Sequence, residues 1–293
     1  MELGKMHFYN KRKFFENWGW RWMTTSKGVT ISICMATYNG ELYISSLLKT
    51  LESQQGPNFE IIVRDDCSRD NTLKILKKFK KESRHTIRII EDKKGKLGPE
   101  ANFLETVRQA RGELILFCDQ DDLWAIDKVE KFREQYFKEN LKDKSAILFN
   151  DYLVFGNLNG FRKVIELELP LSQLKYENYI PGCCMGLTTD LANKMVKVGC
   201  TGLMHDWNAV ILNYVAEGKF IRIPLPLTQY RQHDCNTIGY NQRAMPNFDI
   251  VNFLTNMKSV KVSMQKLGAA HARTYYIFYI FHKIRKIIYS NFR

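Results

Sequence analysis

Residues 114–124 read LILFCDQDDLW. An apolar run over 114–117 leads into Asp119, Asp121 and Asp122, so three carboxylates lie within four residues. A short apolar run of this kind is typical of a buried strand. Like charges repel, so crowding them at the end of a buried strand is unfavourable unless something offsets the charge. The stretch therefore predicts a charged site at the edge of a sheet.

Strand and helix patterns alternate around this stretch. Alternation at this spacing is typical of a parallel sheet with helices on both faces. We therefore predict an α/β fold with a Rossmann-like, mostly parallel central sheet flanked by helices. The predicted strands cover residues 31–37, 59–66, 86–90, 113–118 and 146–150, and the predicted helices cover 41–53, 70–81, 99–110 and 126–139.

The alternation weakens beyond residue 150. Helical patterns begin at Asp190 and cover 204–218, and a short extended segment is predicted over 220–227, before a polar stretch. The residues from 241 onward are expected to form two helices, the second of them amphipathic, aromatic and basic.

The positive charge of the chain lies in its two ends. Of the net charge of +13, residues 1–30 contribute +4 and residues 241–293 contribute +8. We therefore predict three parts: a basic, aromatic N-terminal extension (1–30), a nearly neutral folded domain (31–240), and basic amphipathic C-terminal helices (241–293). The seven cysteines have neither zinc-site nor disulfide spacing, which favours a reducing compartment. No signal peptide or membrane-spanning helix is expected.

Polar side chains follow three of the predicted strands. Ligands bind beyond the carboxyl ends of strands in such sheets, so these residues should converge at one edge. The alternative is that each is a turn or a helix cap, since Asp and Asn favour those places. The residues are Thr37, Tyr38 and Asn39 after the first strand, Asp65 and Asp66 after the second, and Asp119, Asp121 and Asp122 after the fourth.

A divalent cation would explain the crowded carboxylates. Mg²⁺ and Mn²⁺ prefer oxygen ligands and are often held by one or two carboxylates together with substrate phosphates. Asp119 and Asp121 flank a single residue, so both could reach one cation, whereas Asp122 could equally cap the following helix. A solvated acidic turn is the alternative. Trp124 is interpreted as packing at the edge of the pocket.

Three further residues have both a functional and an ordinary interpretation. Asp206, at a predicted helix start, could be a general base or an N-cap. His205 beside it could be a surface residue. His233 could be a metal ligand or an ordinary core or surface histidine, and spacing alone does not distinguish these.

The basic ends also leave three alternatives open. Aromatic and basic side chains together could bind nucleic acid, lie on anionic lipid, or pack on the domain with a solvated basic face. The apolar stretch YYIFYIF beside KIRK favours the membrane, and no nucleic-acid partner is expected.

With these residues in place, the chain strongly resembles the family 2 glycosyltransferases of GT-A fold, most of all bacterial members that build surface polysaccharide, including rhamnosyltransferase-like enzymes. The resemblance covers about residues 30–240. In order along the chain, the matching segments are ISICMATYNGELYI, FEIIVRDDCSRDNT, LGPEANF, ARGELILFCDQDDLW, PGCCMG, HDW and PLTQYRQHDCNTIG. One departure is Cys67, which stands where the family usually has glycine, so the turn must tolerate a side chain or differ in its backbone.

The resemblance implies a nucleotide-sugar donor, a divalent metal (Mn²⁺ or Mg²⁺) and inverting transfer. It implies that Asp206 is the catalytic base, that Asp121 and His233 bind the metal, with Asp119 a possible third ligand, and that Gly182 lies near the acceptor. The donor-side residues carried over are Ala36, Thr37, Tyr38, Asn39, Asp66 and Asp119, and His205 and Trp207 join Gly182 on the acceptor side.

We therefore expect a metal-dependent inverting glycosyltransferase that moves a sugar from a UDP- or dTDP-sugar to a hydroxyl of a lipid-linked bacterial surface glycan. Such an enzyme would be cytoplasmic and peripheral at the inner face of the cell membrane, held there by its basic ends. The alternatives are a metal-dependent nucleotidyltransferase, although no Gly-Lys phosphate loop is present, and a non-catalytic nucleotide-binding scaffold.

Overall fold

The structure is a computed structural model that describes residues 30–156, 163–165, 178–234 and 236, together with residues 258, 262 and 265. Almost all of the two predicted basic ends therefore lies outside the described residues. The predicted division of the chain into three parts stays a prediction.

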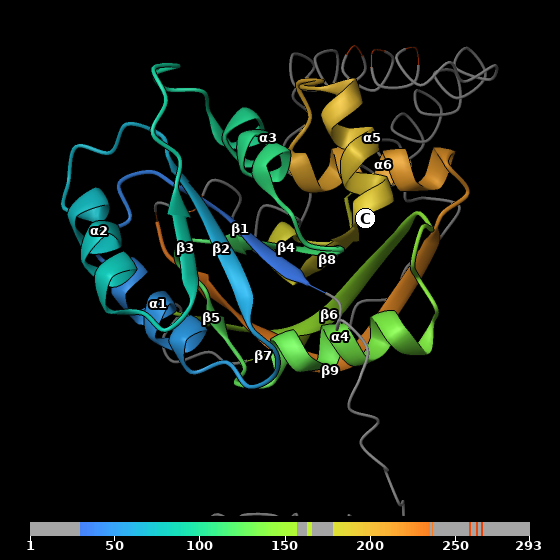
Figure 1. Cartoon of the computed structure of the whole chain (residues 1–293), viewed down its shortest axis with the longest axis horizontal. Helices are drawn as coiled ribbons and strands as arrows, with labels where there is room; N and C mark the ends of the chain where they lie inside the picture. Colours follow the sequence, from blue (N-terminus) through green and yellow to red (C-terminus); the bar gives the residue numbers. More distant parts are fainter. Residues whose placement is uncertain are drawn as a thin grey trace, which may run out of the picture.

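One mixed sheet of nine strands forms the centre of the described chain (Figure 1). Its strands are β1 (Ile31–Thr37), β2 (Phe59–Asp65), β3 (Thr86–Ile89), β4 (Leu114–Asp119), β5 (Leu123–Trp124), β6 (Ala146–Gly156), β7 (Lys163–Ile165), β8 (Met185–Thr188) and β9 (Lys219–Gln232). They are arranged in the order β3-β2-β1-β4-β8-β6-β9-β5, with β7 paired to β6.

Helices cover both faces of this sheet (Figure 1). Alternate residues of β1, such as Ile33 and Cys34, enter two different core clusters. One cluster lies under α3, α5 and α6 and the other under α1, α2 and α4, so the predicted packing on both faces is observed. The helices are α1 (Ile44–Glu52), α2 (Thr72–Glu82), α3 (Pro99–Gln109), α4 (Lys128–Lys138), α5 (Thr189–Val198) and α6 (His205–Val215), with a 3-10 turn, η2, over Gly182–Cys184.

The strands from β3 to β4 agree with the predicted parallel sheet, and the strands beyond β4 enlarge that sheet and make it mixed. Strands β3, β2, β1 and β4 are parallel neighbours. Beyond them β8 pairs antiparallel with both β4 and β6, so the complete sheet is mixed. The segment predicted over 220–227 is part of the longer β9, which runs parallel to β6 through a register shift at Asn150 and Asp151. Pro226 lies opposite Asp151 at this shift, and such irregularities tolerate the missing N–H of proline.

The carboxyl ends of β1, β2 and β4 meet, as predicted. Ala36 pairs in register with Asp119 on one side, and Thr37 pairs with Asp65 on the other. The Thr37 hydroxyl donates a hydrogen bond of 2.8 Å to Asp65 Oδ1. Three segments that are distant in sequence therefore present their polar residues at one edge.

The turn after β2 keeps a glycine-like backbone although Cys67 occupies it. Cys67 has a φ of 64°, in the left-handed region that costs a residue with a Cβ about 1–2 kcal/mol. Ser68 remains in place: its N–H and hydroxyl both donate to Asp65, and its Oγ accepts from the N–H of Asn39. The turn thus tolerates the side chain, the first of the two alternatives.

Candidate active site

The turn after β4 separates the three acids into different environments. Asp119 and Asp121 are half-buried, and Asp122 is fully buried. Asp122 Oδ1 accepts the N–H of Arg231 at 2.8 Å, and within the described chain its Oδ2 is buried without a hydrogen-bond partner. The interpretation of Asp122 as a helix cap is wrong, because β5 intervenes and the N-cap of α4 is Asp127. Trp124 is buried in the core at this edge, as predicted.

Asp121 and His233 meet although 112 residues separate them in sequence. The Nε2 atom of His233 lies 2.9 Å from Asp121 Oδ2, and the His233 ring stacks on Tyr43 with centroids 4.4 Å apart. Asn236 Nδ2 lies 3.3 Å from the same carboxylate oxygen. The end of β9 therefore brings an imidazole and an amide to the D-x-D-D turn.

Two side chains fix the backbone of this turn. Gln120 exchanges two hydrogen bonds of 2.9 Å with the backbone N–H and carbonyl of Tyr38, which ties the end of β4 to the end of β1. The Arg231 side chain donates from Nε to the carbonyl oxygen of Asp121 at 2.8 Å. These three hydrogen bonds hold the turn in place without using the carboxylates of Asp119 and Asp121.

The acids act on one another electrostatically. Burial raises the pKa of the Asp119 carboxyl well above its usual value, and neighbouring carboxylates, Asp206 among them, add to the effect. Burial also raises the pKa of Asp122, and the charge of Asp121 adds to it. Because the charge on Asp206 reaches Asp119, the start of α6 belongs to the same electrostatic site. A bound cation would reverse these shifts by favouring the ionised forms.

Asp206 lies at the start of α6 and faces the η2 turn. Its Oδ2 accepts the N–H of Gly182 at 3.1 Å, and its Oδ1 accepts the N–H of Trp207 at 2.7 Å. The positive end of the helix dipole stabilises a negative charge at this position. The structure thus brings the predicted base and Gly182 together.

His205 is a core residue, so its interpretation as a surface residue is wrong. Its ring stacks on Phe103 with centroids 3.8 Å apart and meets Phe117 edge-on at 4.7 Å. Burial lowers its pKa to about 4, so the ring is neutral. A Cβ at Gly182 would lie 2.5 Å from Nε2 of His205, which explains why glycine is needed there. Trp207 is also buried, and the acceptor role of both rings stays a prediction.

On the donor side, Asp66 organises the loop that precedes α3. Asp66 is buried, and its carboxylate accepts the N–H groups of Leu97 and Gly98 at 2.7 and 2.8 Å and Nη1 of Arg64 at 3.0 Å. It thus holds the loop before α3 against β2. Lys96 in this loop lies over the Tyr38 ring, 3.8 Å from its centroid.

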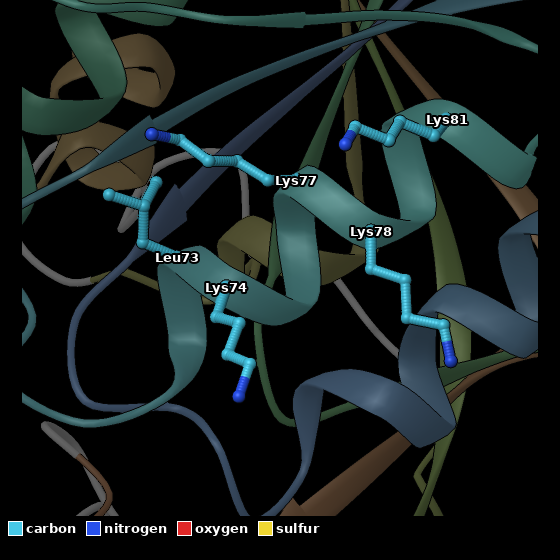
Figure 2. Close-up of a pocket in the computed structure, with 5 residues that line it drawn as sticks. All are labelled: Leu73, Lys74, Lys77, Lys78 and Lys81. Atoms are coloured by element: carbon cyan, nitrogen blue, oxygen red, sulfur yellow. The ribbon is translucent and has the colours of Figure 1, made fainter.

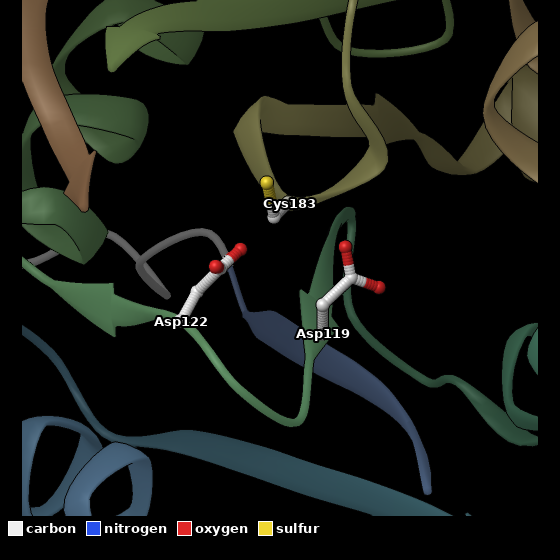
Figure 3. A group of neighbouring side chains, drawn as sticks. All are labelled: Asp119, Asp122 and Cys183. Carbon is white, nitrogen blue, oxygen red and sulfur yellow. The ribbon is translucent and has the colours of Figure 1, made fainter. Parts of the chain in front are cut away.

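The donor atoms at the D-x-D-D turn suit a hard divalent cation. His233 Nε2 and Asp121 Oδ2 are as close as two neighbouring ligands with bonds of about 2.1 Å would be, roughly 3 Å. Separately, Asp119, Asp122 and Cys183 form a group in which one potential ligand atom of each lies within 4.8 Å of the others (Figure 3). Figure 3 shows Cys183 of the η2 turn above Asp119 and Asp122.

A second charged feature lies away from this cluster. Lysines 74, 77, 78 and 81 spread outward from α2 around a shallow hollow that also includes Leu73 (Figure 2). No predicted site residue lines it. Separately, no helix within the described ranges is long and apolar enough to cross a bilayer.

Several site residues were not predicted from the sequence. Arg231 and Asn236 flank His233 in the stretch RQHDCN, where the resemblance assigns a role to His233 alone. Gln120 occupies the variable position of D-x-D, which carries no signal of its own. Lys128 carries no motif signal and Cys183 lies in the matching segment PGCCMG without an assigned role, because their contacts depend on tertiary packing.

Comparisons with known proteins agree on one family. A profile described as Glycosyl transferase family 2 matches residues 32–179. The dTDP-rhamnosyl transferase RfbG of Shigella flexneri is 27% identical over 231 residues, which is 71% of this chain and 74% of RfbG. The poly(ribitol-phosphate) beta-N-acetylglucosaminyltransferase TarS of Staphylococcus aureus is 36% identical over 119 residues, 40% of this chain and 18% of TarS.

A third curated relative is the UDP-Glc:alpha-D-GlcNAc-diphosphoundecaprenol beta-1,3-glucosyltransferase WfgD of Escherichia coli, 28% identical over 54% of this chain and 58% of WfgD. The chain thus spans about three quarters of the length of RfbG but smaller parts of TarS and WfgD.

Solved structures share the fold. A TarS crystal structure in complex with UDP-GlcNAc has a TM-score of 0.60 at 18% identity, covering 80% of this chain and 66% of that chain. The mannosyltransferase PcManGT from Pyrobaculum calidifontis, in complex with GDP-Man and Mn²⁺, has a TM-score of 0.54 at 16% identity, covering 85% and 76%.

Because the pKa of Asp122 is raised, the difference in stability between wild type and Asp122→Asn should change with pH. A carboxyl whose folded-state pKa is raised stabilises the fold at low pH, and this contribution is lost as the pH rises from the unfolded value to the raised one. We expect Asp122→Asn, which cannot ionise, to gain melting temperature relative to wild type as the pH rises above about 5 in EDTA, measured by thermal unfolding. The exposed Asp143→Asn is the control. A difference between Asp122→Asn and wild type that does not change with pH would contradict the account.

Proposed function

The chain belongs to glycosyl transferase family 2, and on this premise we propose that it is a metal-dependent inverting enzyme acting on a bacterial surface glycan. Its donor would be a UDP- or dTDP-sugar and its acceptor a hydroxyl of a growing, lipid-linked glycan. The observation that carries the proposal is the convergence of the D-x-D-D turn, His233 and Asp206 at one edge of the sheet.

Three predictions from the sequence are confirmed by the comparisons. The resemblance to family 2 holds, the fold is GT-A, and the chain is a transferase that uses a nucleotide-sugar donor. Relatives of the chain act on bacterial cell-surface glycans. The nucleotidyltransferase and scaffold alternatives lose their support, because family membership assigns glycosyl transfer.

The metal side of the proposal rests on the chain's own donor atoms. Asp121 and His233 would hold Mn²⁺ or Mg²⁺, with Asp119 beside them, and the buried acids explain why positive charge is favoured there. When bound, such a cation supplies the charge that neutralises a departing nucleoside diphosphate. A structural neighbour with GDP-Man and Mn²⁺ supports this choice of metal.

Asp206 is the proposed general base. Its two oxygens accept the N–H of Gly182 in η2 and the N–H of Trp207 in α6, so the carboxylate is held in one orientation. It would take the proton of the acceptor hydroxyl as that oxygen attacks the anomeric carbon, and the diphosphate would leave from the opposite face. Gly182, His205 and Trp207 are the proposed surroundings of the acceptor.

The donor side would use the ends of β1 and β2. Ala36, Thr37, Tyr38 and Asn39 lie beside the acids, and Asp66 holds the neighbouring loop. Lys96 over the Tyr38 ring adds positive charge on this side. A dTDP-rhamnosyl transferase among the relatives and a UDP-GlcNAc complex among the neighbours support a UDP- or dTDP-sugar.

Substituting the proposed base tests the mechanism. We expect Asp206→Asn to lower kcat by about 10²–10⁴-fold with little change in donor affinity, because it removes proton transfer and keeps the shape of the side chain. Turnover is measured with the sugar that wild type accepts from a panel of UDP- and dTDP-sugars with Mn²⁺. Asp143→Asn should behave as wild type. Full activity of Asp206→Asn would exclude Asp206 as the base.

The acceptor proposal concerns the membrane. WfgD acts on a diphosphoundecaprenol-linked sugar, which supports a lipid-linked acceptor here, and the basic residues of 1–30 and 241–293 would hold the enzyme near anionic lipid. We expect deletion of 270–293 to reduce co-sedimentation with vesicles containing phosphatidylglycerol. Unchanged co-sedimentation would count against this role of the C-terminal residues.

A further inference from the structure

Lys128 is a fully buried lysine that contacts Cys183, one of the residues beside the acid cluster. It begins α4 and none of its surface is exposed. Its Nζ donates to the carbonyl of Cys183 at 2.6 Å and to Oγ1 of Thr228 at 2.9 Å, and it lies 3.8 Å from the centre of the Trp124 ring. An ammonium has three N–H groups, so two hydrogen bonds and one aromatic face satisfy it.

Burying the Lys128 ammonium costs desolvation free energy, so the residue needs an explanation beyond packing. Removing an ammonium from water costs several kcal/mol, of the order seen for buried ions generally. Within the described chain, no carboxylate forms an ion pair with Lys128. Burial lowers its pKa, while nearby thiols and Asp122 oppose that effect. A methionine would fill the same space at lower cost, so packing alone does not explain the residue.

The Lys128 ammonium holds the turn that contacts Asp206. Its bond to the Cys183 carbonyl fixes the middle residue of η2, and the N–H of Gly182, the first residue of η2, donates to Asp206 Oδ2. Thr228 reinforces the same carbonyl with a bond of 3.1 Å from its hydroxyl. The Cys183 sulfur also lies within 4.8 Å of a carboxylate oxygen of Asp119 and of Asp122.

We propose that Lys128 is a positioning residue for sugar transfer: through the Cys183 carbonyl it holds the Gly182–Cys184 turn, and with it the Asp206 carboxylate, against the D-x-D-D turn. This inference rests on the proposed role of Asp206. Lys128 touches neither donor nor acceptor in this account. Its positive charge also offsets part of the negative charge of Asp119.

The test compares three variants. Lys128→Met keeps the length of the side chain and removes the ammonium, and the Thr228 hydroxyl remains able to bond the Cys183 carbonyl. Thr228→Val keeps the ammonium but removes its second partner together with the hydroxyl bond to the Cys183 carbonyl. Lys131→Met, one turn along α4, loses only an ion pair with Glu134 at the surface and is the matched control.

The first readout needs no turnover. Hydrogen–deuterium exchange of the peptide 180–186 reports the N–H groups of the η2 turn. We expect it to be about 10-fold faster in Lys128→Met, and faster to a smaller extent in Thr228→Val, with no change in Lys131→Met. Exchange as slow as in wild type in both Lys128→Met and Thr228→Val would overturn the proposal.

The second readout separates positioning from folding. In Lys128→Met, UDP with Mn²⁺ should bind within about 2-fold of wild type by calorimetry, while kcat per folded molecule falls about 10-fold or more. A merely structural residue would lower the melting temperature and leave kcat per folded molecule unchanged, which would overturn the inference. If Lys128→Met does not fold, Thr228→Val decides: a fall of about 3-fold in kcat supports the proposal and wild-type kcat overturns it.

Different results would refute the proposed function and the proposed role of Lys128. If wild type turns over none of the nucleotide sugars, the proposed function fails, while the exchange data still decide whether Lys128 holds the turn. If wild type is active and the exchange of 180–186 is unaffected by both variants, the role of Lys128 fails and the proposed function stands.

Discussion

Repulsion among Asp119, Asp121 and Asp122 is the constraint on which the rest of the site depends. Each acid has a different surrounding. Asp122 is buried and accepts the N–H of Arg231, Asp121 lies against His233, and the distant positive charge of Lys128 acts on Asp119. These interactions do not fully offset the cost of ionising the acids, because the pKa values of Asp119 and Asp122 stay raised. An incompletely neutralised cluster at the open end of a rigid sheet is suited to bind a cation when substrate arrives.

The mixed half of the sheet completes the site. Strand β8 runs antiparallel between β4 and β6, so the η2 turn before it reaches the end of β4. Strand β9 runs parallel to β6 and carries Arg231 and His233 to the same edge. The parallel half supplies the acids and the proposed donor residues, and the mixed half supplies their partners and the proposed base.

The sequence predicted the parallel half well because buried strands and amphipathic helices have local periodic patterns. It also predicted that the ends of β1, β2 and β4 would meet. The sequence predicted only residues 220–227 of β9, because prolines and polar residues interrupt the apolar pattern of a strand that is set by pairing with β6. The two-residue β5 was not predicted. Lys128 could not be predicted as a site residue, because its burial under Cys183 is a tertiary contact between residues 55 apart in sequence.

The central claim, that the crowded acids exist to hold a divalent cation beside the donor diphosphate, is tested most directly by anomalous scattering. Crystals of the full chain grown with UDP and Mn²⁺ should show one manganese peak within bonding distance of Asp121 and His233, and the peak should vanish in Asp121→Asn. A structure in which UDP is bound but no manganese lies beside these two residues would contradict the account.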